Sequence, residues 1–286
     1  MWAPGCMGNT VQGGNNPDDG IQGHGDDLRA PAWWGTYVTA VVDEVETSAE
    51  RHRREVPRAS SIGRVAVVLV TAAISLTLIS FFRGPATFIA LIPAAAEGNT
   101  DFYRLVWWAL VSITCYVLIP AVSILALRGS LFDYGAGRPV TASSWKPYAV
   151  LFGLSAPFIL AASFLPGFQA KYPFYHLAEG ESIWPYLAVF WVLYVLQFVA
   201  LELFFRGYLL FGLSPRLGVA AVFVMVVPYT MIHFTKPFAE ALSAIIGGTV
   251  LGFLSLKTHS VWWGAALHIA IAMTMDVLAL WHVGIL

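Results

Sequence analysis

Long apolar stretches separated by short polar segments dominate the sequence after residue 60. About 20 consecutive apolar residues cross the hydrocarbon layer of a bilayer as an α-helix, so each long stretch predicts a transmembrane helix. The predicted spans are residues 63–82, 104–127, 147–166, 184–213, 217–234, 238–256 and 261–281. Residues 85–96 are apolar but short, which indicates an interfacial or re-entrant segment. The predicted fold is an all-α, polytopic transmembrane helical bundle of about seven spans, six to eight.

The first 60 residues have a different pattern and are predicted to form a separate region. Residues 1–30 are polar and acidic, which is typical of a disordered tail with nothing to bury. In residues 33–55 apolar side chains recur at helical spacing and lead into a basic run. This pattern predicts a juxtamembrane amphipathic helix on the membrane surface, although a plain soluble helix fits it equally well. The predicted organisation is therefore a region at 1–60 and a transmembrane domain at 61–286.

Composition agrees with a membrane protein and excludes several other classes. Hydrophobic residues make up 58% of the chain and charged residues 12%, whereas about a quarter of a soluble domain is charged. The net charge of −1, without a basic stripe, argues against nucleic-acid binding. Cys6 and Cys115 are isolated, so neither a disulfide framework nor a CxxC metal site is available. Lipid is the predicted surrounding of most of the chain.

The distribution of Lys and Arg predicts the orientation of the helices. If every predicted span crosses, one side of the membrane carries the basic positions Arg51, Arg53, Arg54, Arg58, Arg128, Arg138, Lys146, Arg216 and Lys257. Cytoplasmic loops carry an excess of Lys and Arg. This side, together with the N-terminus, is therefore predicted to face the cytoplasm, and the cell membrane is the expected location.

The last 85 residues contain six ionisable residues within predicted spans. They are Glu202, Arg206, His233, Glu240, His268 and Asp276. Such residues are costly in lipid and usually mark a functional site or a buried pair. The four-residue spacing of Glu202 and Arg206 puts them on one helix face, within reach of an ion pair. Each histidine alone is more often a packing residue, but two histidines with a carboxylate indicate a shared site.

The chemistry open to this set leads to hydrolysis by either of two routes. Two neutral imidazoles and a carboxylate can bind Zn²⁺ with an open position, with His233 and His268 as the imidazole ligands. A carboxylate in apolar surroundings can instead act as a general base on water, with the imidazoles orienting that water or stabilising an oxyanion. The sequence leaves the choice between a zinc site and a glutamate-type site open.

Three short motifs over residues 184–281 resemble the CAAX-protease and bacteriocin-processing (CPBP, or Abi) family of intramembrane proteases. The family has a Glu-Glu-x-x-x-Arg helix, a Phe-x-x-x-His helix and a late His-x-x-x-Asn helix. In this chain they read Leu201-Glu202-Leu-Phe-Phe-Arg206, Tyr229-Thr-Met-Ile-His233 and His268-Ile-Ala-Ile-Ala272. The resemblance implies an endopeptidase that hydrolyses a peptide bond of a membrane-associated substrate, with Glu202, Arg206, His233 and His268 as site residues.

Two positions depart from the family pattern. Leu201 replaces the glutamate usually credited with activating water, and Ala272 replaces the asparagine. Either Glu202 takes over as base, or Glu240 and Asp276 are recruited as second-rank residues, or the chain is an inactive protein that keeps the scaffold. The alternative function is thus a non-catalytic membrane scaffold or a bacteriocin-immunity-type protein. A channel or transporter is disfavoured because no internal repeat is present.

Overall fold

The computed structural model describes residues 32–93, 100–138, 144–176 and 184–286, and all regular elements in these ranges are helical. The predicted disordered tail lies outside the described residues. The elements are α1 (Ala32–Glu55), α2 (Arg58–Phe82), α3 (Pro85–Leu91), α4 (Thr100–Ile113), η2 (Thr114–Leu118), α5 (Ile119–Ala126), η3 (Leu131–Tyr134), α6 (Lys146–Ser163), α7 (Pro166–Gln169), α8 (Tyr186–Glu202), η4 (Leu203–Leu209), α9 (Leu210–Leu217), α10 (Ala220–Met231), α11 (Phe238–Thr258) and α12 (Trp262–His282).

The protein is an integral, multi-pass membrane protein with an all-helical fold, as predicted. Among the described residues, six helical stretches are long and apolar enough to cross a bilayer: Arg58–Phe82, Asp101–Ala126, Lys146–Ser163, Tyr186–Leu217, Phe238–Thr258 and Trp262–His282. The remaining predicted span, 217–234, corresponds to α10, which has 12 residues. At 1.5 Å per residue α10 is about 18 Å long, less than the ~30 Å hydrocarbon layer. Helix α10 is therefore too short to cross the hydrocarbon layer alone, and Phe234 in the turn that follows it is 68% exposed.

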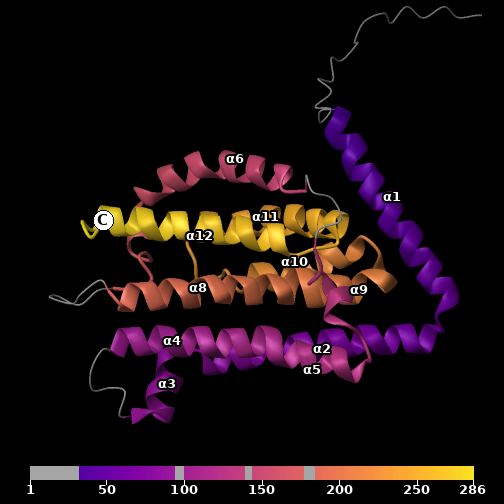
Figure 1. The fold of residues 1–286 in the computed structure, drawn as a ribbon, viewed down its shortest axis with the longest axis horizontal. Helices are drawn as coiled ribbons and strands as arrows, with labels where there is room; N and C mark the ends of the chain where they lie inside the picture. The colour runs from indigo at the N-terminus through magenta and orange to yellow at the C-terminus, as the bar shows by residue number, and fades with distance from the viewer. Residues whose placement is uncertain (1–31, 94–99, 139–143, 177–183) are drawn as a thin grey trace, which may run out of the picture.

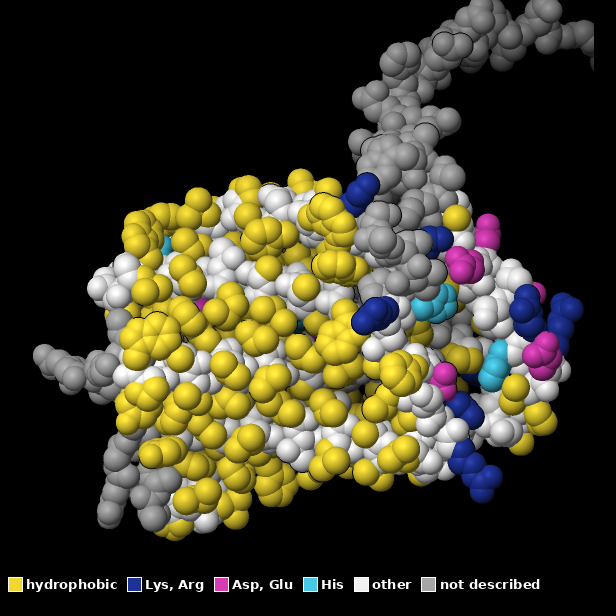
Figure 2. All heavy atoms as spheres, viewed as in Figure 1, with side chains coloured by type: hydrophobic (Ala, Val, Ile, Leu, Met, Phe, Trp, Pro, Cys, Tyr) yellow, Lys and Arg dark blue, Asp and Glu magenta, His cyan; other side chains and the backbone are white. Residues whose placement is uncertain are grey.

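The long helices run roughly parallel, and the two ends of the bundle differ in chemistry (Figure 1). Helix α1 crosses one end, where charged side chains gather, while apolar side chains cover most of the visible flank (Figure 2). We call this charged end the basic end, because Arg53, Arg216 and Lys257 lie there. Helix α1 is held there by Glu46, which accepts a hydrogen bond from Val219 N at 2.7 Å. Arg53 also donates to Arg216 O at 3.2 Å.

The helix formed by α8, η4 and α9 runs through the centre of the bundle and contacts α4, α12, α10, α2 and α1. Its middle part, η4, is a seven-residue π-helix that contains Phe204, Phe205 and Tyr208, all buried. π-Helical turns are rare and are found frequently at functional sites. Gly207 allows a close approach here, because a Cβ at this position would lie 2.9 Å from Tyr134 O. The central helix thus carries a local widening directly after Glu202.

Candidate active site

Glu202 joins two segments that are distant in the sequence. It is the last residue of α8, and its side chain is fully buried. Its Oε1 atom accepts a hydrogen bond from Arg206 Nη1 at 2.8 Å and lies 2.9 Å from His268 Nδ1. Arg206 belongs to η4 and His268 to α12. The structure therefore brings three of the four predicted site residues together around one carboxylate oxygen.

The ion pair of Glu202 and Arg206 at the centre of the site is fully buried. Arg206 is as fully buried as Glu202, and breaking such a pair leaves an uncompensated buried charge. The Arg206 guanidinium carbon lies 3.9 Å from the centroid of the Tyr229 ring, which adds a cation–π contact. Arg206 Nε and Nη2 make no hydrogen bond with the described residues. The guanidinium thus fixes Glu202 and keeps two donor atoms to spare.

His233 lies in the turn after α10, and its ring contacts the ring of Tyr229. Its Nδ1 atom is 2.8 Å from Tyr229 O, so Nδ1–H donates to this carbonyl and Nε2 is left as an acceptor. The Tyr229 ring centroid is 4.8 Å from that of His233 and 6.4 Å from that of His268. The Tyr229 ring is therefore a neighbour of both imidazoles.

The Nδ1 atom of His268, like that of His233, has an oxygen acceptor, here the Glu202 carboxylate instead of a backbone carbonyl. Since carboxylates accept hydrogen bonds, Nδ1–H of a neutral His268 donates to Glu202 Oε1 and Nε2 is free to accept a proton. The His268 side chain is 14% exposed, whereas Glu202 is fully buried. His268 is therefore the accessible member of the pair, with Glu202 behind it.

The second oxygen of Glu202 has space beside it because residue 264 is a glycine. Oε2 makes no hydrogen bond with a described residue. A Cβ at Gly264, in the first turn of α12, would lie 3.2 Å from Oε2. No feature of the sequence singled out Gly264, since glycine is common in membrane helices. Its role follows only from the packing of α12 against the end of α8.

We expect Gly264→Ala to lower the activity of the site by about tenfold. The added methyl group crowds Glu202 Oε2 and shifts the carboxylate from His268, and small misplacements of reacting groups cost up to about 10²-fold in rate. Gly247→Ala in α11 is the matched control, because a Cβ there meets nothing within 4 Å. Equal rates for the two variants in a peptide-cleavage assay would contradict the role given to this space.

The structure places Glu240 and Asp276 away from Glu202. The chain leaves the helical path at 232–237, so Glu240 begins the next helix, α11, and does not share a face with His233. Asp276 accepts hydrogen bonds from Trp191 Nε1 at 2.8 Å and from Phe174 N at 3.4 Å. Neither carboxylate has a hydrogen bond to Glu202, His233 or His268 among the described residues.

Glu240 instead takes part in a group that holds the turn with His233 in place. Its two oxygens accept hydrogen bonds from the Tyr172 hydroxyl, each at 3.1 Å, and Lys236 Nζ lies 3.2 Å from Oε1. Lys236 Nζ also bonds the Tyr172 hydroxyl. Burial, and then the charge of Glu240, raise the pKa of Tyr172 far above its usual value, so the phenol stays protonated. We call Tyr172, Lys236 and Glu240 the turn anchor.

Tyr172→Phe is expected to loosen the turn and lower the cleavage rate about tenfold, because His233 loses its fixed position. The change removes the hydroxyl bonds to Glu240 and Lys236 and is expected to cost about 1–2 kcal/mol of stability. Hydrogen exchange of the amides at 232–237 should become faster. Tyr103→Phe, at an exposed tyrosine of α4, is the control. Unchanged exchange and an unchanged rate in Tyr172→Phe would exclude the anchor.

Apolar packing fills both positions that depart from the family pattern. Leu201 is 4% exposed and belongs to the large central core cluster, together with Phe204 and Phe205. Ala272 is 5% exposed and belongs to a cluster around Tyr194 and Phe190. Any chemistry therefore falls to Glu202, Arg206 and the two histidines.

The predicted zinc site stays a prediction. Among the described residues no group of three or more His, Cys, Asp and Glu side chains is placed to hold a metal ion. Glu202 Oε1 already accepts a hydrogen bond from Arg206 and lies 2.9 Å from His268 Nδ1. These two atoms are therefore engaged with each other or with Arg206 and are not free to bind a metal ion. Because no three such side chains converge in the described part of the chain, no reaction step below is routed through a metal.

Comparison with known proteins agrees with the resemblance of the motifs. Residues 182–274 match the family model described as type II CAAX prenyl endopeptidase Rce1-like. The matched segment contains Glu202, Arg206, His233 and His268 but ends before Asp276. No curated protein and no solved structure gives a significant match. The segment that builds the site is thus similar to type II CAAX prenyl endopeptidases of the Rce1-like family, and the predicted resemblance to the CPBP family is confirmed.

Proposed function

We propose that the protein is an intramembrane endopeptidase that hydrolyses a peptide bond of a membrane-associated substrate. The observation that carries the proposal is the shared contact of Arg206 and His268 with Glu202 Oε1 in a fully buried position. A carboxylate that holds one imidazole nitrogen leaves the other basic and oriented, as in other carboxylate–imidazole pairs that act as general bases. The family match over residues 182–274 supports the same class of reaction.

In this proposal His268 activates water and Glu202 supports it. His268 Nε2 takes a proton from a water molecule, and the resulting hydroxide adds to the carbonyl carbon of the substrate. The C–N bond then breaks, and His268 returns the proton to the leaving amine. Glu202 stabilises the imidazolium that forms in between, and its bond to Nδ1–H fixes the tautomer that presents Nε2. Arg206 keeps Glu202 ionised and in place.

His233 and Tyr229 complete the site in supporting roles. The Nε2 atom of His233 is free because Nδ1 is bonded to Tyr229 O, so it can orient the attacking water. The ring of Tyr229 lies beside both imidazoles and covers the Arg206 guanidinium. Exclusion of bulk water by this ring strengthens the electrostatic contacts of the buried pair. His233 is thus a second functional imidazole of the site, without a direct bond to Glu202.

The orientation of the protein follows from its basic end. Cytoplasmic segments of membrane proteins are rich in Lys and Arg, so we place the basic end, with α1 and the N-terminus, on the cytoplasmic side of the cell membrane. The substrate is a peptide or protein segment in or at the bilayer. Its scissile bond lies at the same depth in the membrane as the turn after α10, which contains His233.

The experiment that tests the function is cleavage of a panel of membrane-tethered peptides by the purified protein in detergent. We expect cleavage by the wild type and its loss in His268→Ala and His233→Ala. His282→Ala is the matched control, because His282 lies on the same helix α12 but is bonded to Ser163, at 3.0 Å. Absence of cleavage by the folded wild type across the panel would favour a non-catalytic scaffold, for which Leu201 and Ala272 are the sequence evidence.

Metal dependence is measured in the same assay. A hydrolase that works through the Glu202–His268 pair should keep its rate after treatment with a chelator and extensive dialysis. Loss of activity, restored by added Zn²⁺, would instead support the zinc site predicted from the sequence, with His233 and His268 as ligands.

A further inference from the structure

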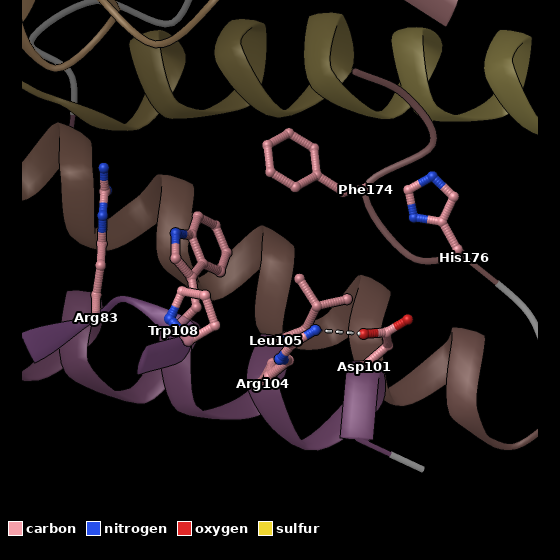
Figure 3. A pocket seen from close by; sticks show the side chains of 8 residues that line it. Arg83, Asp101, Arg104, Leu105, Trp108, Phe174 and His176 are labelled. Atoms are coloured by element: carbon pink, nitrogen blue, oxygen red, sulfur yellow. Dashed lines mark hydrogen bonds and ion pairs between the residues drawn. The ribbon is translucent and has the colours of Figure 1, made fainter. Parts of the chain in front are cut away.

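A pocket with a cationic lining lies outside the candidate active site. Its volume is about 250 Å³, far more than one water needs, ~10–15 Å³. Arg83, Asp101, Arg104 and Trp108 form one wall, and Phe174 and His176 form the other. Figure 3 shows these side chains converging from α2 and α4 on one side and from the 174–176 segment on the other. We call this space the arginine pocket.

The pocket carries an excess of positive charge. Asp101 forms an ion pair with Arg104, at 2.9 Å between Oδ1 and Nη1, and so neutralises one of the two arginines. The Arg83 side chain has no ion pair or hydrogen bond with a residue of the described ranges. The ring of Phe174 is contacted by two further cations, with Lys236 Nζ at 4.7 Å and Lys171 Nζ at 5.7 Å from its centroid. Glu240 neutralises Lys236, and Asp276 accepts a hydrogen bond from Phe174 N. The formal charge of the described lining is thus +1 and comes from Arg83.

The location of the pocket is that of a lipid headgroup region. It lies where one membrane-spanning helix ends, at Phe82, and the next begins, at Asp101. Trp107 Nε1 donates to Phe82 O at 2.7 Å and ties these two ends together. The side chains on the outside of this junction are apolar and exposed, with Phe81 at 72% and Leu91 at 57%. Acyl chains can therefore lie against α2 and α3 while the headgroup reaches the pocket.

We propose that the arginine pocket binds the phosphate of an anionic phospholipid. An arginine presents several N–H donors that match phosphate oxygens. The net charge of +1 favours a headgroup without a compensating ammonium group, so phosphatidylglycerol should bind better than phosphatidylcholine. The inference is independent of the proposed peptidase activity, because none of Glu202, Arg206, His233 and His268 lines the pocket.

The test is lipid retention by the purified full-length protein in an equimolar mixture of phosphatidylglycerol and phosphatidylcholine, measured by native mass spectrometry. We expect the wild type to retain phosphatidylglycerol preferentially. Arg83→Gln should reduce this preference about tenfold, the loss expected for one charge-assisted hydrogen bond. Arg83→Lys should keep part of this lipid preference, a result that would show that position 83 can be changed without unfolding the protein. Arg51→Gln, an exposed arginine of α1 at the other end of the molecule, should behave like the wild type.

Three results would overturn the proposal. The first is equal retention of both lipids by the wild type. The second is an equal loss in Arg83→Gln and Arg51→Gln, which would indicate a general effect of charge. The third is displacement of the lipid by millimolar inorganic phosphate, which would make a soluble anion the ligand. A higher KM for acidic peptides in Arg83→Gln with unchanged lipid retention would likewise reject the lipid and assign the pocket to the substrate.

Discussion

Glu202→Gln is expected to reduce the rate of peptide cleavage about a thousandfold or more while the protein remains folded. Glutamine keeps the size of the side chain, but it removes the negative charge that stabilises the His268 imidazolium. Removal of a general acid–base group typically costs about 10²–10⁴-fold, and loss of a carboxylate that fixes an imidazole tautomer has cost about 10⁴-fold elsewhere. The substrate still binds, so the loss should appear in kcat more than in KM.

The control for this prediction is Glu50→Gln, at an exposed position of α1. It removes one carboxylate without touching the bundle interior and should leave kcat unchanged. A Glu202→Gln variant that retains most of the wild-type kcat would contradict a catalytic role for the carboxylate. It would also make Arg206 and His268 packing residues around a buried polar group.

Arg206→Met should destabilise the protein by about 3–5 kcal/mol, because it leaves Glu202 as a buried carboxylate without its cation. Methionine replaces most of the volume of the arginine stem, so a large cavity is not the cause. Replacing both members of the pair, as in Glu202→Met with Arg206→Met, should recover part of this loss, since no unpaired charge remains. The measurement is denaturant or thermal unfolding in detergent at fixed lipid content.

Lys257→Met is the matched control for Arg206→Met. Lys257 forms an ion pair with Glu44 at 3.4 Å, and both side chains are well exposed. Exposed pairs contribute little to stability, so little change is expected. A similarly small effect of Arg206→Met would mean that Glu202 is satisfied by other groups. A double variant less stable than Arg206→Met alone would contradict the argument from unpaired charge.

The sequence was sufficient to predict the helices and the contact of Glu202 with Arg206, because both depend on local rules. Apolar length alone defines a span, and charged residues in lipid are rare enough to be conspicuous. The four-residue spacing of Glu202 and Arg206 predicted their contact directly. The approach of His268 to the same carboxylate comes from the packing of α12 against α8.

Other parts of the site depend on tertiary packing and could not be predicted from the sequence. The helix periodicity that put Glu240 on the face of His233 fails because α10 ends at Met231 and the next helix starts only after Pro237. The space at Gly264 beside Glu202 and the contact of Tyr172 with Lys236 arise between segments far apart in the chain. Propensity does not encode such contacts.

A double-mutant cycle of Glu202→Gln and His268→Ala on the cleavage rate tests the central claim most directly. If Glu202 acts through His268, either single change should remove nearly the whole contribution of the pair to the cleavage rate. The double variant should then be no slower than His268→Ala alone. If the effects instead multiply, so that the double variant loses the product of the two single losses, Glu202 and His268 work independently and the proposed pair is wrong.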